Sequence, residues 1–101
     1  MPVILGYIRR YPGMTDKEAG EVQTRLATVA RLHGRTLGTV HAEDLPTDPQ
    51  AFDALLASLN ELPAPAVIVP TKAHLGHWDQ VGSKYDLLRR ARAEVIVADV
   101  T

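Results

Sequence analysis

Two arginines and a tyrosine follow the first apolar run of the chain and are its first residues with a capacity for chemistry. Arg9 and Arg10 come directly after the run from Val3 to Ile8, and guanidinium groups bind anions such as phosphate. We interpret them as solvated charges at a strand end, with an anion site beside the free amides of the next helix as the alternative. Tyr11 follows, and a phenol oxygen can attack a phosphodiester. We nevertheless expect Tyr11 to be a packed or surface residue.

Histidines supply the second group of candidate ligands. His74 and His77 have the spacing that places two side chains on one helical face, and His41 and Asp79 could converge with them at the ends of neighbouring strands. Together these four residues could hold a divalent metal. Two histidines in a loop are more often polar surface groups, so we predict no metal site and no cofactor. The chain has no cysteine, which excludes disulfides, thiolate catalysis and cysteine-ligated metals.

The elements that must position these residues begin with a strand and a helix. Val3 to Ile8 is nearly continuous apolar sequence, typical of a strand covered on both faces. Thr15 and Glu18 have the spacing of a capping box, which predicts a helix from Asp16 to His33. Gly34 stands where a left-handed residue ends a helix.

The same order of elements repeats in the middle of the chain. Thr36 to His41 resumes a strand pattern, and Asp48-Pro49 combines an N-cap with a proline at the first helical position. Pro63-Ala64-Pro65 ends the second helix. The predicted buried stripe of that helix comprises Phe52, Leu55, Leu56, Leu59 and Leu62.

A third strand and helix lead to a final strand. Ala66 to Val69 is apolar and β-branched, and a polar loop from Thr71 to Trp78 follows it. The third helix is predicted from Asp79 to Arg92, and the last strand from Glu94 to Val100. The inward positions of this helix are Val81, Tyr85 and Leu88.

This alternation of strands and helices predicts the fold class. Strands joined by single helices run parallel, because each crossover returns the chain to the same end of the sheet. We therefore predict a three-layer α/β sandwich with a mostly parallel four-stranded sheet. In such folds the loops after the strands build the site. These loops are Arg9 to Thr15, His41 to Thr47 and Pro70 to Trp78.

The first strand and the residues after it carry a family resemblance. Gly6-Tyr7-Ile8-Arg9-Arg10-Tyr11 resembles the opening motif of the serine recombinase catalytic domain, the resolvase/invertase family. Tyr7 and Arg9 match the family's Tyr and Arg, whereas Tyr11 stands where the family has its nucleophilic serine. The resemblance covers nearly the whole chain and implies a flavodoxin-like strand order of 2-1-3-4.

The second family signature is degenerate in this chain. It corresponds to Lys72-Ala73-His74-Leu75-Gly76-His77. Ala73 replaces the family's Asp, and His74 and His77 replace two of its arginines. A neutral imidazole offers one donor where arginine offers a charged fork. The family's transesterification needs a serine nucleophile and several guanidinium groups to stabilise the transferring phosphoryl group, so the resemblance implies that this chemistry is lost.

We therefore predict that the chain is not an enzyme and acts in protein–protein interaction or oligomerisation. One alternative is a DNA recombinase with a rearranged site. Another is a small flavodoxin-like domain that binds an anion or a metal near Arg9, His41 and His74. The expected partner is a second copy or another protein, through the last strand or the third helix. The candidate interface residues are Tyr85, Leu88, Arg92 and Val100.

Length and composition agree with these expectations. The chain has 101 residues, of which 46% are hydrophobic and 23% charged, as in one soluble globular domain spanning residues 1–101. Eleven basic and twelve acidic residues give a net charge of −1, so we expect no autonomous DNA binding. The sequence shows neither an apolar run of about 18 residues nor a secretory signal, and we expect a cytoplasmic protein without membrane contact.

Overall fold

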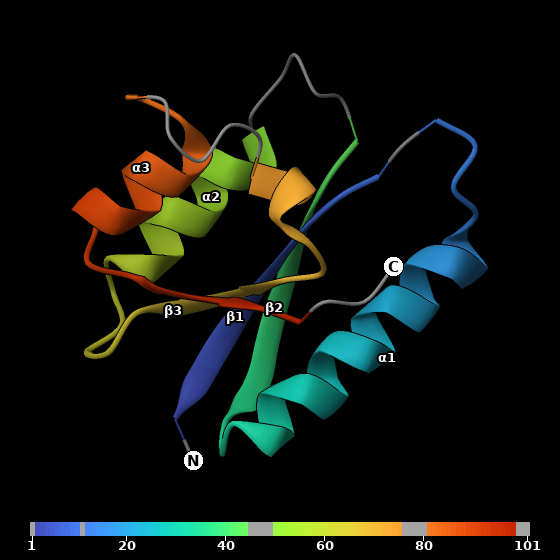
Figure 1. Cartoon of the computed structure of the whole chain (residues 1–101), viewed down its shortest axis with the longest axis horizontal. Helices are drawn as coiled ribbons and strands as arrows, with labels where there is room; N and C mark the ends of the chain where they lie inside the picture. The colour runs from blue at the N-terminus through green and yellow to red at the C-terminus, as the bar shows by residue number, and fades with distance from the viewer. Residues whose placement is uncertain (1, 11, 45–49, 76–80, 99–101) are drawn as a thin grey trace.

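Four strands form one parallel sheet in the order β2-β1-β3-β4. The computed structural model describes residues 2–10, 12–44, 50–75 and 81–98. Every pairing between neighbouring strands is parallel. The strands are β1 (Val3–Arg9), β2 (Thr36–Glu43), β3 (Ala66–Val69) and β4 (Glu94–Val97). The predicted α/β fold and strand order are confirmed (Figure 1).

Helices cover both faces of this sheet. The helix α1 (Asp16–Leu32) lies on one face, and α2 (Gln50–Leu59) and α3 (Lys84–Arg90) lie on the other (Figure 1). A short 3-10 helix, η1 (Lys72–Leu75), follows β3. Among the helices of the described residues, none has both the length and the apolar character needed to cross a membrane.

Local sequence sets both ends of α1. The Thr15 hydroxyl accepts from the Glu18 backbone N–H at 3.1 Å, and the Glu18 carboxylate accepts from the Thr15 backbone N–H at 3.2 Å. The predicted capping box is therefore confirmed. At the other end, Gly34 follows the C-cap residue His33 with φ of 72°, the left-handed conformation that glycine adopts without strain.

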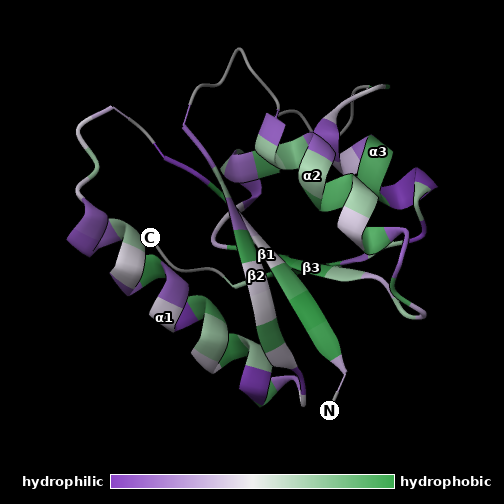
Figure 2. Cartoon of the chain, turned by 180° about the vertical axis from the view of Figure 1, so that it is seen from behind, coloured by the Kyte–Doolittle hydropathy of each residue, from purple (hydrophilic) through white to green (hydrophobic). Residues whose placement is uncertain are grey.

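The core consists of two apolar clusters, one on each face of the sheet. Side chains of β1 alternate between them, and most of the strand is hydrophobic in Figure 2. The α1-side cluster contains Ile4, Ile8, Leu26, Ala30, Ala66, Ile68 and Ile96. The α2/α3-side cluster contains Leu5, Tyr7, Phe52, Leu55, Leu59, Val67, Val69, Leu75 and Leu88.

The third helix is shorter than predicted. The expectation that a helix already includes residue 81, with Val81 on its inner face, is wrong, because Val81 is 85% exposed. Gly82 adopts a φ of 81° and Ser83 caps the helix, its hydroxyl accepting from the Asp86 backbone N–H at 3.1 Å. The helix therefore begins at Lys84 and ends at Arg90, two residues before its predicted end.

Four other details also differ from the prediction. The strand β2 continues two residues past His41, to Glu43. The segment predicted as a polar loop after β3 contains η1. Leu62 lies beyond the end of α2 rather than within its buried stripe, although it packs against the α2/α3-side cluster. The last strand ends at Val97, and Val100 lies outside the described residues.

The two sheet edges are β2 and β4, as predicted, and they differ in regularity. Along β1 and β2 the register moves from Ile4 opposite Leu37 to Gly6 opposite Val40, so β2 contains an extra residue. The strand β4 pairs with β3 over all four of its residues without interruption. A bulge on an edge strand disturbs the backbone groups with which another strand would pair.

Candidate functional site

A buried tyrosine and a buried glutamate meet at the carboxyl ends of β1 and β2. The Tyr7 hydroxyl donates to a carboxylate oxygen of Glu43 at 3.0 Å, and the backbone N–H of Phe52 donates to the same oxygen at 3.1 Å. Glu43 is only 3% exposed. Burial, and then the hydrogen bond to Glu43, raise the pKa of the Tyr7 hydroxyl above its usual value. Tyr7 is thus held as a neutral donor.

A lysine from the start of α3 lies over the rings of Tyr7 and Phe52. The Lys84 ammonium lies 5.4 Å from the centre of the Tyr7 ring and 5.8 Å from that of Phe52. The two rings pack edge to face with their centres 5.5 Å apart, so they present a shared aromatic surface to the cation. Burial, followed by the charge of Arg9, lowers the pKa of Lys84, while the charge of Glu43 opposes this shift.

His74 is fixed against the end of β1. The Arg9 backbone N–H donates to Nδ1 of His74 at 2.8 Å. Because Nδ1 accepts this bond, the proton of the neutral ring sits on Nε2. Burial, and then the nearby Arg9 charge, lower the pKa of His74. The next residue, Leu75, is buried in the core and anchors η1 beneath the histidine.

The two adjacent arginines have different surroundings. The Arg10 guanidinium lies 2.8 Å from a carboxylate oxygen of Asp16 in the first turn of α1 and 3.9 Å from one of Asp44. The chain's own carboxylates therefore occupy the place beside α1 where an anion could bind. Within the part of the chain that the structure describes, the Arg9 side chain makes no ion pair. Arg9 is the more open of the two to an external anion.

Of the four predicted metal ligands, the structure describes His41 and His74. His77 and Asp79 lie outside the described residues, and so does Tyr11. His41 lies opposite Tyr7 in the β1–β2 register, and its Nε2 is buried without a partner among described atoms. Burial lowers the pKa of this histidine. Across the described ranges, no three His, Asp or Glu side chains come together as metal ligands.

The interface candidates separate into buried and exposed residues. Leu88 has no exposed surface, so its prediction as a contact residue is wrong: its side chain faces the core between α3 and the sheet. Tyr85 is partly buried against the same α2/α3-side cluster. Arg92 is exposed beyond the end of α3, and Ala73 is exposed on η1.

Sequence reasoning did not identify Glu43 and Lys84 as site residues. Glu43 was missed because the second strand was predicted to end at His41. In the structure β2 continues to Glu43, which lies opposite Arg9. Lys84 was assigned to the middle of a longer helix. The signal that could have placed it at a helix start was Ser83 followed three residues later by Asp86.

The site therefore contains two cations, a neutral phenol, a neutral imidazole and one buried carboxylate, all near the carboxyl ends of the strands. Such a set can bind an anion through Arg9 and Lys84. The hydrogen bond from Tyr7 to Glu43 fixes the aromatic ring over which Lys84 lies. No protein-family model, curated protein or solved structure matches this chain.

Proposed function

We propose that this chain is a non-catalytic, resolvase-like binding domain that holds an anionic group of a partner at the carboxyl end of its sheet. The observation that carries the proposal is a charge imbalance. Arg9 and Lys84 interact through their charges, yet neither forms an ion pair with a described residue. Glu43, the buried acid beside them, offsets only one of these two charges. A phosphate or carboxylate would neutralise this excess positive charge.

Residues at the family's signature positions argue against DNA strand exchange. The position that resembles the family's nucleophilic serine holds Tyr11. The positions that resemble the family's Asp and first signature Arg hold Ala73 and His74. His74 uses Nδ1 to accept from the Arg9 backbone, so it cannot replace an arginine fork. These features support binding without transfer of a phosphoryl group.

The anion site is tested by titrating the protein with inorganic phosphate and following the backbone amide NMR signals at about 150 mM salt, where screening suppresses incidental surface contacts. We expect saturable shifts at Arg9 and His74. The variants Arg9→Gln and Lys84→Met each remove one charge and should weaken binding by about tenfold. The matched control is Arg31→Gln, on the exposed side of α1. Equal phosphate affinity in Arg9→Gln and Arg31→Gln would overturn the proposal.

A separate experiment tests whether the protein cleaves or joins DNA. After incubation with duplexes that carry recombination sites, the protein should show no covalent protein–DNA product on denaturing gels. A product that disappears in Tyr11→Phe would instead establish a tyrosine-based recombinase.

Self-association is the second candidate function, favoured by the difference between the two sheet edges. The bulge interrupts β2, whereas β4 pairs regularly and is the outermost described strand on its side. A regular edge strand can pair with another chain. Sedimentation at about 100 µM, well above the dissociation constant of a typical specific interface, should then show a dimer. A monomer at this concentration would exclude self-association.

A further inference from the structure

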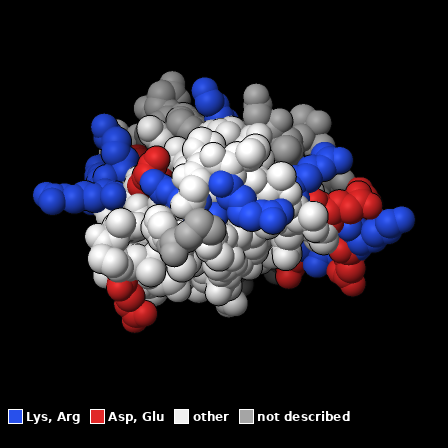
Figure 3. Space-filling view, turned by 90° about the horizontal axis from the view of Figure 1, so that it is seen from below, with Lys and Arg blue, Asp and Glu red and all other residues white. Residues whose placement is uncertain are grey.

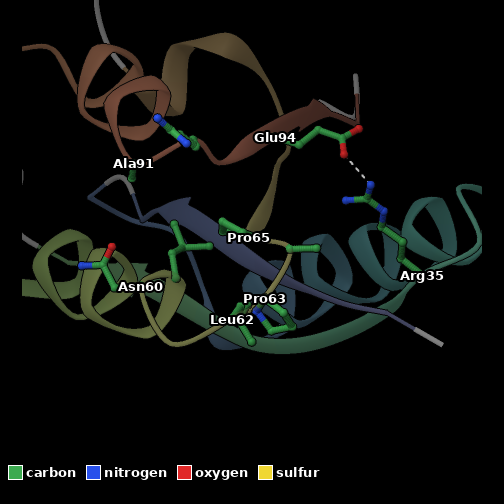
Figure 4. A pocket seen from close by; sticks show the side chains of 10 residues that line it. Arg35, Asn60, Leu62, Pro63, Pro65, Ala91 and Glu94 are labelled. Carbon is green, nitrogen blue, oxygen red and sulfur yellow. Dashed lines mark hydrogen bonds and ion pairs between the residues drawn. The ribbon is translucent and has the colours of Figure 1, made fainter.

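A cavity lies away from the Arg9 site, at the amino ends of β3 and β4. Its volume is about 520 Å³, which is within the range of small-molecule sites. Leu62, Pro63 and Pro65 come from the loop between α2 and β3, and Ala91 from the end of α3 (Figure 4). The complete lining is Arg35, Leu59, Asn60, Leu62, Pro63, Ala64, Pro65, Ala91, Arg92 and Glu94. Most of these residues are apolar, and two are arginines.

The first arginine, Arg35, follows the end of α1. The backbone N–H of Gly34 donates to the carbonyl of Arg31, and that of Arg35 donates to the carbonyl of Ala30, both at 2.9 Å. This pair of bonds is a Schellman motif, with glycine at its left-handed position. The Arg35 guanidinium forms an ion pair with Glu94 across the cavity edge (Figure 4). Its charge is therefore already compensated.

The second arginine, Arg92, ends α3 with the same motif. The backbone N–H of Arg92 donates to the carbonyl of Arg89, and that of Ala93 donates to the carbonyl of Leu88, both at 3.0 Å. Here, however, the left-handed position holds an arginine, with φ of 59°. A side chain with a Cβ is strained in this conformation, and glycine is the usual residue. Arg92 is the only non-glycine residue with a positive φ in the described part of the chain.

The charge of Arg92 also lacks compensation. Its two arginine neighbours on α3, Arg89 and Arg90, both bind the carboxylate of Asp86, at 3.0 and 3.1 Å. Within the described ranges Arg92 forms no ion pair. Figure 3 shows Lys and Arg side chains across the middle of the face at the amino ends of β1 and β2, with acidic side chains mostly toward its sides. The unpaired Arg92 guanidinium in the cavity lining thus favours a negative ligand.

We propose that this cavity binds a small organic anion with an apolar body. The body would lie on Leu62 and on the rings of Pro63 and Pro65, which line the cavity and keep exposed surface, and the anionic group would pair with the Arg92 guanidinium. The Asn60 amide, which lines the same cavity, can donate a further hydrogen bond. Ligand binding gives a reason for keeping an arginine where the backbone favours glycine, since strained residues persist where their side chains serve a site. This inference is independent of the anion site at Arg9.

The decisive variant is Arg92→Gly, because it should raise the stability of the protein and lower its affinity for the ligand at the same time. Glycine relieves the backbone strain, so the melting temperature should rise by about 4 °C. At the same time the variant removes the guanidinium, so the affinity for anilinonaphthalene sulfonate, an aromatic anion, should fall by about tenfold. Arg90→Ala is the matched control: it removes a charge from the same helix end outside the cavity lining and should leave this affinity unchanged.

Two further measurements locate the binding and define its chemistry. Phenylnaphthylamine is the same probe without the sulfonate and should bind much more weakly. The amide NMR shifts caused by the sulfonate should centre on Asn60 and Ala91 and persist in Arg9→Gln. The proposal is overturned if the wild type shows no saturable binding, if Arg92→Gly retains full affinity, or if both probes bind equally. Loss of binding in Arg9→Gln would move the ligand to the other site.

Discussion

The two faces of the sheet are built from the same strands but differ in chemistry. The α1-side cluster contains only aliphatic residues. On the opposite face, the core includes Tyr7, whose hydroxyl reaches the buried Glu43, and Lys84 lies over the aromatic rings. The strict alternation of β1 produces this division, because Ile4 and Ile8 face α1 while Leu5 and Tyr7 face away. One face supplies stability alone, and the other combines stability with a polar site.

The largest effect should come from truncating the purely apolar face. Leu26→Ala removes a fully buried side chain between α1 and the sheet and should lower the free energy of unfolding by about 3 kcal/mol. Urea denaturation measures this loss. Since Leu26 is on the face opposite the polar site, the folded variant should bind phosphate with wild-type affinity. Weakened phosphate binding in folded Leu26→Ala would show that the faces are coupled.

A smaller loss should follow from removing the buried acid. Glu43→Ala leaves the Tyr7 hydroxyl and the Phe52 backbone N–H without their shared acceptor, so we expect a loss of about 2 kcal/mol. Tyr7→Phe removes one of these donors, and the double variant should therefore be less destabilised than the sum of the single changes. A double-mutant cycle with urea denaturation measures this coupling. Additive losses would mean that the 3.0 Å contact contributes nothing to stability.

The smallest effect should be a pH dependence from the histidine at the site. The pKa of folded His74 lies below its usual value of 6.5. When the pH falls through 6.5, the unfolded chain therefore takes up a proton that the folded chain does not, and stability decreases. The decrease is at most about 1.4 kcal/mol per pH unit for this group and stops below its folded pKa. His41 has a pKa shift of the same sign and adds to the wild-type slope.

His74→Asn isolates the contribution of that group. Asparagine keeps an acceptor for the Arg9 N–H but does not titrate. Urea unfolding between about pH 5 and 7 should therefore show a shallower loss of stability in the variant. The same slope in both proteins would mean that His74 contributes nothing to the pH dependence.

Features that depend on residues close together in the sequence were predictable. The capping box of Thr15 and Glu18 and the left-handed Gly34 involve residues within a few positions of each other, and both are confirmed. The parallel orientation of the strands followed from their alternation with helices. The late start of α3 was missed because apolar Val81 fits a helical stripe, whereas the turn at Gly82 and the cap at Ser83 decide the boundary.

The candidate site was less predictable because its contacts span the chain. Tyr7 and Arg9 were singled out, but their partners lie 36 and 65 residues away. Burial of Glu43 depends on how far β2 continues beside β1, and the position of Lys84 depends on the docking of α3. Neither dependence leaves a periodic pattern in the sequence. Arg92 was predicted only as an interface residue. Its left-handed backbone, and the ion pairs with Asp86 that Arg89 and Arg90 form and Arg92 does not, are visible only in the structure.

The central position of β1 has a consequence for biosynthesis. This strand is synthesised before the other three, yet its two neighbours in the sheet are β2 and the much later β3. Pairing over such sequence separations is slow compared with helix formation. At a synthesis rate of roughly 5–20 residues per second, the apolar β1 waits for seconds before β3 exists. During that interval we expect nascent chains to be substrates for chaperones that shield hydrophobic segments.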